Sequence, residues 1–288
     1  IPHSAPSGRC RCPTHRKSIR TRNCQARPLL GVAFDPKGGS FRREIFPEYK
    51  ANRPATPEDI ALSIPYIKRI LDAMCVPVLE VEGFEADDVI GTLSQKGVEA
   101  GYDVYMVTPD KDYGQLVRPC CKLYKQKGDG IEIVDCDAIR AHYGFDDPTL
   151  VRDVLALWGD ASDNIPGVPG IGEKTAMQLL HDFGTLEGVY ANIDDERIKK
   201  GARTKLQNGE QSAKDSYWLA TIDRSVPLDL DVEHLPAQDI DETALYDLLT
   251  RLEFKNFIKR FDLSGESVSA PRLPELKTER VSAKYLSS

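Results

Sequence analysis

Eight acidic residues stand at the ends of the segments that the apolar pattern predicts to be strands and helices. They are Asp35, Glu85, Asp87, Asp88, Asp110, Asp112, Asp160 and Asp163. Ligands of parallel sheets bind at the carboxyl ends of the strands, so we expect these side chains to converge there. Gathered carboxylates need cations, and Mg²⁺ or Mn²⁺ suit oxygen ligands in partly hydrated sites. The pattern predicts a two-metal site, the device for in-line phosphodiester hydrolysis.

The spacing within this set supports a shared site. Asp110 and Asp112 point the same way if the chain there is extended. Asp160 and Asp163 are three residues apart, which places them on one face if they lie on a helix. Any one of these acids alone would more often be a helix cap or a turn residue. The recurrence at successive element ends is what favours metal binding.

A glycine-rich segment supplies a second signal. Residues 167–176 read Gly-Val-Pro-Gly-Ile-Gly-Glu-Lys-Thr-Ala. Glycines allow a tight turn, and the helix that follows offers free amides and a positive dipole end to a phosphate. A helix and a turn precede the segment, whereas a dinucleotide-binding loop would follow a strand. This order favours a helix–hairpin–helix that grips a DNA backbone without reading sequence. A tight helix–helix turn without a ligand is the alternative.

Basic and aromatic residues alternate just after Asp35. Phe41, Arg42 and Arg43 begin this stretch, and Tyr49-Lys50 and Arg53 end it. Such a mixture suits phosphate neutralisation and base stacking on single-stranded nucleic acid. A solvated surface is the alternative explanation.

The elements that must position these residues follow two regimes. Apolar strand runs at 29–34, 78–81, 104–107, 121–124 and 131–134 alternate with helical patterns at 56–74 and 86–100. This alternation predicts an α/β domain with a largely parallel sheet. After about residue 137 only helical patterns follow, at 148–158, 173–183, 185–191, 215–222, 243–252 and 254–261. The second domain is therefore expected to be mostly α.

Composition limits the class of protein. The chain has 288 residues, 41% of them hydrophobic and 29% charged, which is ordinary for a water-soluble globular protein. No apolar run approaches the roughly 18 residues of a membrane span, so no membrane partner is expected. The net charge is −7, and residues 1–30 contain no acid, so all of the acidic residues lie in residues 31–288. A region this acidic would bind nucleic acid through local basic features or metal ions rather than through its overall charge.

The cysteines fit no disulfide framework. The count of seven is odd and no secretion signal is present, which favours free thiols in a reducing cytoplasm. Cys10, Cys12, His15 and Cys24 could together bind zinc, but their spacing is poor and a disordered basic tail is the simpler interpretation.

Taken in order, these motifs closely resemble the 5′ nuclease family, which includes flap endonucleases and the 5′ nuclease domain of bacterial DNA polymerase I. The similar segments are Ala33–Asp35, Phe41-Arg42, Tyr49–Arg53, Glu85–Asp88, Thr108–Asp112, Gly159–Gly167 and Gly170–Ala176. The resemblance implies a PIN-like, largely parallel sheet with flanking helices at 29–140. It implies a helix–three-turn–helix DNA-binding domain at 141–263, with 1–28 an irregular basic tail and 264–288 a linker or tail.

The resemblance also implies roles for individual residues. The eight acids would hold two Mg²⁺ or Mn²⁺ ions, and Lys50, Arg53 and Arg42 would act at the scissile phosphate. Gly167, Gly170, Gly172, Lys174 and Thr175 would hold the duplex backbone, with K⁺ in the loop. The implied activity is structure-specific 5′-3′ cleavage of flapped or branched DNA and RNA-primed DNA, in a bacterial cytoplasmic, nucleoid-associated protein with a polymerase domain possible in a longer parent chain.

One departure from the family opens an alternative. The family begins with an apolar strand that ends in Asp-Gly, whereas residues 1–28 show neither, and no acid precedes Asp35. A sheet without that strand and a site without that carboxylate would give a catalytically impaired DNA-binding fragment.

A third interpretation belongs to another enzyme class. Asp110-Lys111-Asp112 after an apolar strand is similar to the Asp-x-Asp of aspartyl-phosphate phosphatases. Those enzymes usually have Thr or Val where Gly114 stands, and they would not explain the loop at 167–176.

Overall fold

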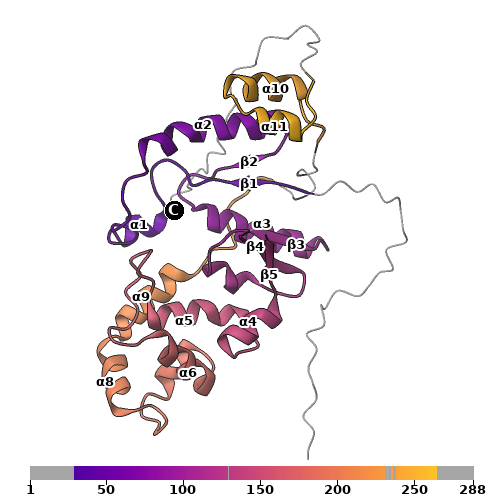
Figure 1. Ribbon diagram of the computed structural model, residues 1–288. Coiled ribbons are helices and arrows are strands. Elements are labelled where there is room, and N and C mark those ends of the chain that lie inside the picture. Colours follow the sequence, from indigo (N-terminus) through magenta and orange to yellow (C-terminus); the bar gives the residue numbers. More distant parts are fainter. Residues whose placement is uncertain (1–28, 129, 231, 233–234, 236–237, 265–288) are drawn as a thin grey trace, which may run out of the picture. The chain divides into compact units, whose positions relative to one another are not determined.

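The computed structural model describes residues 29–264 except 129, 231, 233–234 and 236–237 (Figure 1). The expectations for residues 1–28, including the missing first strand and the zinc alternative, lie outside the described residues, as does nearly all of the expected linker. The described residues divide into two compact units. The first unit contains 42–53 and 90–224, and the second contains 29–41, 54–89 and 225–264.

The strands of the first unit form a small mixed sheet. β3 (Val104–Val107) pairs in parallel with β4 (Cys121–Lys127), and β4 pairs antiparallel with β5 (Gly130–Val134). Met106 and Leu123 are opposite each other in the register and are 3% and 1% exposed, so they form the buried face of the sheet. α4 (Cys136–Tyr143) follows β5, and its N-cap Asp135 accepts hydrogen bonds from the amides of Asp137 and Ala138.

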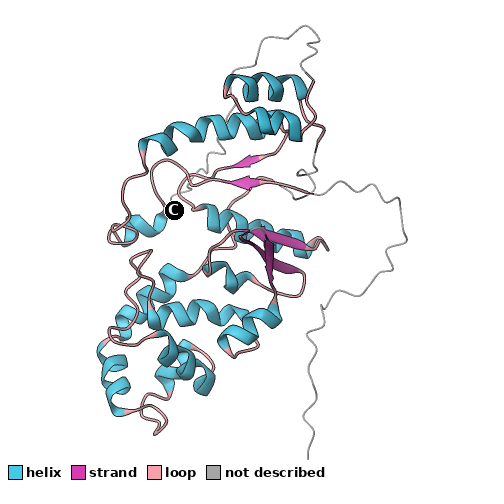
Figure 2. Ribbon diagram, in the orientation of Figure 1, coloured by secondary structure: helices cyan, strands magenta, loops and turns pink. Residues whose placement is uncertain are grey.

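Outside this sheet, the regular secondary structure of the first unit is helical (Figure 2). α5 (Val151–Trp158) follows the short 3₁₀ helix η2 (Pro148–Leu150) and is the central helix, because its residues 154–157 are at most 2% exposed. α6 (Glu173–Phe183), α7 (Leu186–Ala191), α8 (Lys200–Asn208) and α9 (Glu210–Ala220) complete the helical region. α1 (Phe41–Ile45) begins at the last residue of the second unit and continues into the first.

The second unit pairs β1 (Val32–Ala33) in parallel with β2 (Val78–Leu79). α2 (Glu58–Ala73), α10 (Glu242–Arg251) and α11 (Lys255–Arg260) form its helical part. Ala73, Leu245, Leu249 and Leu263 make a small core there. α3 (Ala86–Glu99) begins in the second unit and continues into the first after Val89.

The expected architecture is confirmed: strands and helices alternate in the first half, and helices follow. Three short helices, α1, α4 and α8, were not predicted from the apolar pattern. In the described part of the chain no helix is both long and apolar enough to cross a bilayer.

Candidate active site

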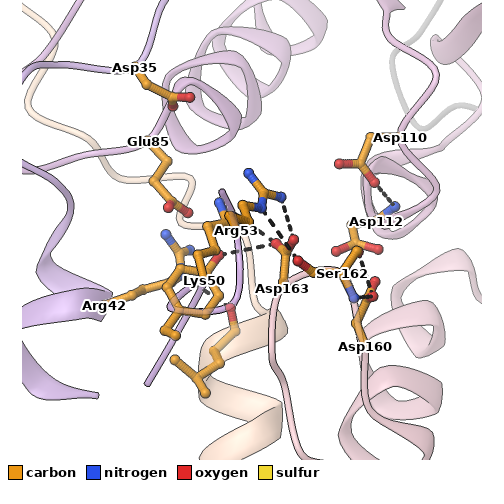
Figure 3. A network of polar contacts seen from close by, with 12 residues as sticks. Asp35, Arg42, Lys50, Arg53, Glu85, Asp110, Asp112, Asp160, Ser162 and Asp163 are labelled. Atoms are coloured by element: carbon orange, nitrogen blue, oxygen red, sulfur yellow. Dashed lines mark hydrogen bonds and ion pairs between the residues drawn. The ribbon is translucent and has the colours of Figure 1, made fainter. Parts of the chain in front are cut away.

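Four of the predicted ligands lie around one pocket of the first unit. Asp110, Asp112, Asp160 and Asp163 line it together with Pro109, Lys111 and Ser162, and its volume is ≈ 410 Å³ (Figure 3). We call this group the carboxylate pocket. Two turns build it, one after β3 and one after α5.

The turn after β3 is fixed by its own acid. β3 ends at Val107, and the 3₁₀ helix η1 begins at Asp112. The Asp110 carboxylate accepts a hydrogen bond from the Asp112 amide at 3.0 Å, an Asx turn that holds the two side chains near each other. The buried residues Tyr113 and Leu116 anchor η1 in the hydrophobic core of the first unit.

The turn after α5 depends on glycine. Gly159 has φ +84°, and a Cβ there would meet the Ile165 carbonyl oxygen at 2.6 Å, so no other residue fits without movement. Asp160 and Ile165 exchange backbone hydrogen bonds of 2.9 and 2.8 Å, which close the turn. Asp160 Oδ1 accepts from the amide and the hydroxyl of Ser162 at 2.8 and 2.6 Å. The closed turn directs Asp160 and Asp163 into the pocket.

Asp112 is the electrostatically strained member of the pocket. Its Oδ1 is buried and has no hydrogen-bond partner among the described residues. Burial, followed by the charges of Asp110 and Asp160, raises the pKa of the Asp112 carboxyl to about 8. The nearby Lys111 ammonium does not offset the charges of Asp110 and Asp160 on this carboxyl. A divalent cation carries twice the charge of an ammonium and would stabilise the ionised Asp112, so the pocket has the electrostatics of a divalent metal site.

Asp160 is held ionised by its neighbours. Burial opposes its ionisation, but hydrogen bonds from Ser162 and from Lys111 outweigh burial and lower the pKa of its carboxyl. Lys111 Nζ lies 2.9 Å from Asp160 Oδ2 and 4.8 Å from the centre of the Trp158 ring. This role of Lys111 was not predicted from the sequence, although its position between Asp110 and Asp112 could have indicated it.

Asp163 contacts the basic segment at 49–53 through both its carboxylate and its backbone carbonyl. Arg53 Nη2 donates to Asp163 Oδ1, and Lys50 Nζ lies 3.7 Å from Asp163 Oδ2. The Lys50 amide donates to the Asp163 carbonyl at 2.9 Å, and Asn52 donates to the Ala161 carbonyl at 2.6 Å. Two of the residues predicted to act at the phosphate are thereby placed beside a predicted metal ligand.

Arg42 lies in a different setting. Its side chain is 2% exposed, and its guanidinium donates to the carbonyls of Leu219 at 3.1 Å and Thr221 at 2.6 Å, at the end of α9. These contacts tie the basic segment to α9, and the role at the scissile phosphate that the family resemblance implies for Arg42 stays a prediction.

The other four predicted ligands belong to the second unit. Asp35 follows β1, and its Oδ1 accepts from the Ala86 amide at the start of α3 at 2.8 Å. Asp88 Oδ2 accepts from the Glu85 amide at 3.2 Å. Asp87 is in the first turn of α3. The structure therefore groups the eight acids as two sets of four, and a single site for all eight stays a prediction.

The residues that could hold a metal are of the expected kind but are not arranged as a finished site. In the regions that the structure describes, no three His, Cys, Asp or Glu side chains form a ready metal-binding group. Asp160 and Asp163 are instead paired with Lys111, Lys50 and Arg53. The ligand types and the orphaned Asp112 oxygen fit a divalent cation, which would have to compete with these protein cations.

The glycine loop at 167–172 joins the turn after α5 to the start of α6. Val168 and Ile171 are 1% and 4% exposed and anchor it, while Gly170 and Gly172 are exposed. Gly172 is the N-cap of α6 and makes no side-chain cap, and Lys174 and Thr175 are exposed in the first turn. The exposed positions of the loop and of the first turn of α6 thus include four residues predicted to contact a phosphate.

Gly167 differs from the other predicted loop residues because it is buried. Its amide donates to Ser216 Oγ at 2.9 Å, and its carbonyl accepts from Ser212 Oγ at 2.5 Å. With φ +60°, a Cβ at Gly167 would meet the Trp158 carbonyl oxygen at 2.7 Å. The structure gives Gly167 a part in forming the turn, and the two serines that hold it were not predicted from the sequence.

Comparison with known proteins is consistent with this geometry. Residues 15–144 match the family model described as 5′-3′ exonuclease, N-terminal resolvase-like domain. Residues 147–243 match 5′-3′ exonuclease, C-terminal SAM fold.

Curated relatives are longer than this chain. DNA polymerase I of Caldicellulosiruptor bescii is 41% identical over 239 residues, which are 82% of this chain and 28% of that protein. DNA polymerase I of Pseudomonas aeruginosa is 42% identical over 255 residues, 86% of this chain and 27% of that protein. The chain spans little more than a quarter of the length of these relatives.

Solved structures share the fold. T5 D15 protein co-crystallised with metal ions is 26% identical with a TM-score of 0.54, covering 76% of this chain and 82% of that one. The catalytic core of Rad2 in complex with DNA substrate is 20% identical with a TM-score of 0.51, covering 76% and 72%.

Proposed function

The chain belongs to the 5′-3′ exonuclease family, and we propose that it is a metal-dependent 5′-3′ nuclease that hydrolyses phosphodiester bonds in DNA. The observation that carries the proposal is the carboxylate pocket, where four acids gather and Asp112 has a buried oxygen without a partner. A cluster of this kind gains stability from divalent cations, and phosphodiester hydrolysis is the chemistry that two such cations serve.

Mg²⁺ or Mn²⁺ would be held in the first unit by Asp110, Asp112, Asp160 and Asp163. The acids of the second unit, Asp35, Glu85, Asp87 and Asp88, are proposed as the remaining ligands. A bound divalent pair supplies an activated water and neutralises the charge that develops on the phosphate. Support comes from the T5 D15 protein, which is co-crystallised with metal ions.

The protein's own cations prepare the site for a phosphate. Lys50 and Arg53 pair with Asp163 in the absence of DNA. A phosphate oxygen is an acceptor of the same geometry as a carboxylate, and the Arg fork binds either one. We propose that the scissile phosphate takes over Lys50 and Arg53, which leaves the Asp163 carboxylate available to a metal.

DNA binding is assigned to the glycine loop. The amides near Gly170 and Gly172, together with Lys174 and Thr175, would contact backbone phosphates rather than bases. The K⁺ that the family resemblance implies for this loop would have to displace Lys205 from the Gly170 carbonyl, to which its Nζ donates at 2.8 Å.

The substrate class is proposed from the family resemblance. Flapped or branched DNA and RNA-primed DNA are the proposed substrates, and the relatives named DNA polymerase I suggest a polymerase domain in a longer parent chain. DNA as substrate would place the protein at the bacterial nucleoid, in the cytoplasm.

Cleavage of a 5′-labelled flap duplex by this chain, with Mg²⁺ and with EDTA, tests the proposal beside a binding measurement on the same DNA. We expect cleavage with Mg²⁺, none with EDTA, and binding in both. Binding without cleavage at any Mg²⁺ or Mn²⁺ concentration would identify a DNA-binding module instead. A phosphoaspartate trapped on Asp110 would point to the phosphatase class.

A further inference from the structure

Two backbone carbonyls of the glycine loop accept hydrogen bonds from side chains of α8 and α9. Ser212 Oγ donates to the Gly167 carbonyl at 2.5 Å, and Lys205 Nζ donates to the Gly170 carbonyl at 2.8 Å. The Val168 carbonyl accepts from the Ile171 amide at 2.9 Å. An alkali ion in such a loop would need several of these oxygens as ligands, in place of its hydration shell.

Lys205 is exposed and lies in the last turn of α8, just before the buried Gly209. A Cβ at Gly209 would meet Val168 Cγ1 at 2.9 Å, so this end of α8 lies close against the glycine loop. A Cβ at Gly170 would meet Lys205 Cε and Nζ at 3.0 Å. The end of the lysine side chain therefore lies against Gly170, and the ammonium occupies the space beside the Gly170 carbonyl.

The charge of Lys205 is not matched by an acid. Lys214 on α9 is paired with Glu210 at 2.6 Å, whereas Lys205 makes no ion pair with an acidic side chain of the described chain. The loop it contacts leads into the N-terminus of α6, whose dipole disfavours a nearby cation. The exposed Lys205 ammonium would therefore be stabilised by an anion that binds beside the loop.

We infer that Lys205 supplies the glycine loop with a built-in cation, which holds the Gly170 carbonyl and pairs with a backbone phosphate of bound DNA in place of K⁺. This inference rests on the proposed DNA-binding function of the loop. Its consequence is specific: the chain binds duplex DNA equally well whether or not K⁺ is present.

Binding of the whole chain to a labelled flap duplex in EDTA, in KCl and in tetramethylammonium chloride of equal ionic strength, tests the inference. The wild-type Kd is expected to agree within about twofold between the two salts, because general screening is then matched. Lys205→Met keeps the stem but removes the ammonium, and should weaken binding about tenfold in tetramethylammonium, with KCl restoring about threefold.

Lys214→Met is the matched control, since it removes one lysine from α9 without touching the loop. It should change the Kd by about twofold at most and equally in both salts. Lys205→Arg keeps the charge and should retain most of the binding. A wild-type Kd that rises about fivefold or more without K⁺ overturns the inference, as does a Lys205→Met chain that binds like wild type in tetramethylammonium.

Thermal melting without DNA separates this inference from the proposed function. KCl should raise the Tm of Lys205→Met relative to tetramethylammonium, because K⁺ then reaches the freed carbonyl, and it should leave the wild-type Tm unchanged. A wild-type chain that binds no DNA in either salt refutes the DNA-binding function. In that case the melting comparison alone decides, and a K⁺-dependent wild-type Tm refutes the built-in cation.

Discussion

The carboxylate pocket and the glycine loop are neighbours in the sequence but differ in how their polar atoms are satisfied. In the loop, the Gly167 and Gly170 carbonyls and the Gly167 amide all have side-chain partners. In the pocket, a buried oxygen of Asp112 has none, and the like charges of Asp110 and Asp160 act on this carboxyl more strongly than the opposite charge of Lys111. The loop is therefore prepared for its ligand by rigidity, whereas the pocket is prepared by unbalanced charge.

The largest effect should come from removing charge from the pocket. Asp110→Asn should reduce flap cleavage about 10³-fold or more, because metal-held charge stabilisation contributes several kcal/mol to such reactions. DNA binding through the loop should stay within about twofold of wild type. Cleavage is measured in single turnover with Mg²⁺, and binding in EDTA. Equal loss of both quantities would show that the two regions are not independent.

The glycine loop should be sensitive to substitutions that strain its backbone rather than to changes of charge. Gly167→Ala places a Cβ against the Trp158 carbonyl at a positive φ, and should lower the free energy of unfolding by about 3 kcal/mol. Gly172→Ala is the control, because no atom lies within 4 Å of a Cβ there and φ is −97°. It should cost under about 1 kcal/mol. Urea unfolding measures both, and similar losses would contradict the strain argument.

Neutralising Asp112 should stabilise the metal-free protein. Its pKa of about 8 exceeds that of an ordinary Asp, so the folded chain holds a proton that the unfolded chain releases. The stability contributed by that proton is complete below about pH 4 and falls as pH rises to about 8. Asp112→Asn should raise metal-free stability at pH 8 by about 2 kcal/mol and remove this part of the pH dependence.

The same variant sharpens the contrast when metal is added. Mg²⁺ should raise the wild-type Tm more than that of Asp112→Asn, because the variant has lost a ligand and has no excess charge to relieve. Melting curves of both chains at pH 6 and pH 8, each with EDTA and with Mg²⁺, give the four shifts in Tm that Mg²⁺ causes. A variant that is less stable than wild type in EDTA would contradict the account of the pocket.

The smallest effect belongs to Lys174, in the first turn of α6 after the glycine loop. Lys174→Ala should weaken duplex binding about equally for all sequences and reduce the slope of log K against log salt by about one unit. Titrations at several salt concentrations on two unrelated sequences check this. A loss confined to one sequence would mean that Lys174 contacts bases.

Sequence reasoning reached the elements with strong periodicity and the residues at their ends. It predicted strands at β3 to β5 and placed Asp110, Asp112, Asp160 and Asp163 at element ends, where the structure has them. α8 was not predicted because only Leu206 is buried on it, so the helix leaves almost no apolar pattern. Periodicity detects a buried face, and a helix held by polar contacts lacks one.

Side-chain partners across long stretches of sequence could not be predicted. Arg42 lies in a basic, aromatic stretch that looks exposed, yet it is buried on the carbonyls of Leu219 and Thr221. Lys205 and Ser212 look like ordinary surface residues until α8 and α9 fold against the glycine loop. Such contacts depend on tertiary packing, which local propensity does not contain.

The position of Lys111 gives the protein an optical reporter of its own. The Lys111 ammonium lies over the Trp158 ring and is paired with Asp160, so anything that captures the Asp160 carboxylate also changes the electric field at the indole. The chain has only two tryptophans, and the other, Trp218, is 38% exposed on α9. In a Trp218→Phe chain, tryptophan emission would therefore report cation entry into the carboxylate pocket directly, without label or substrate.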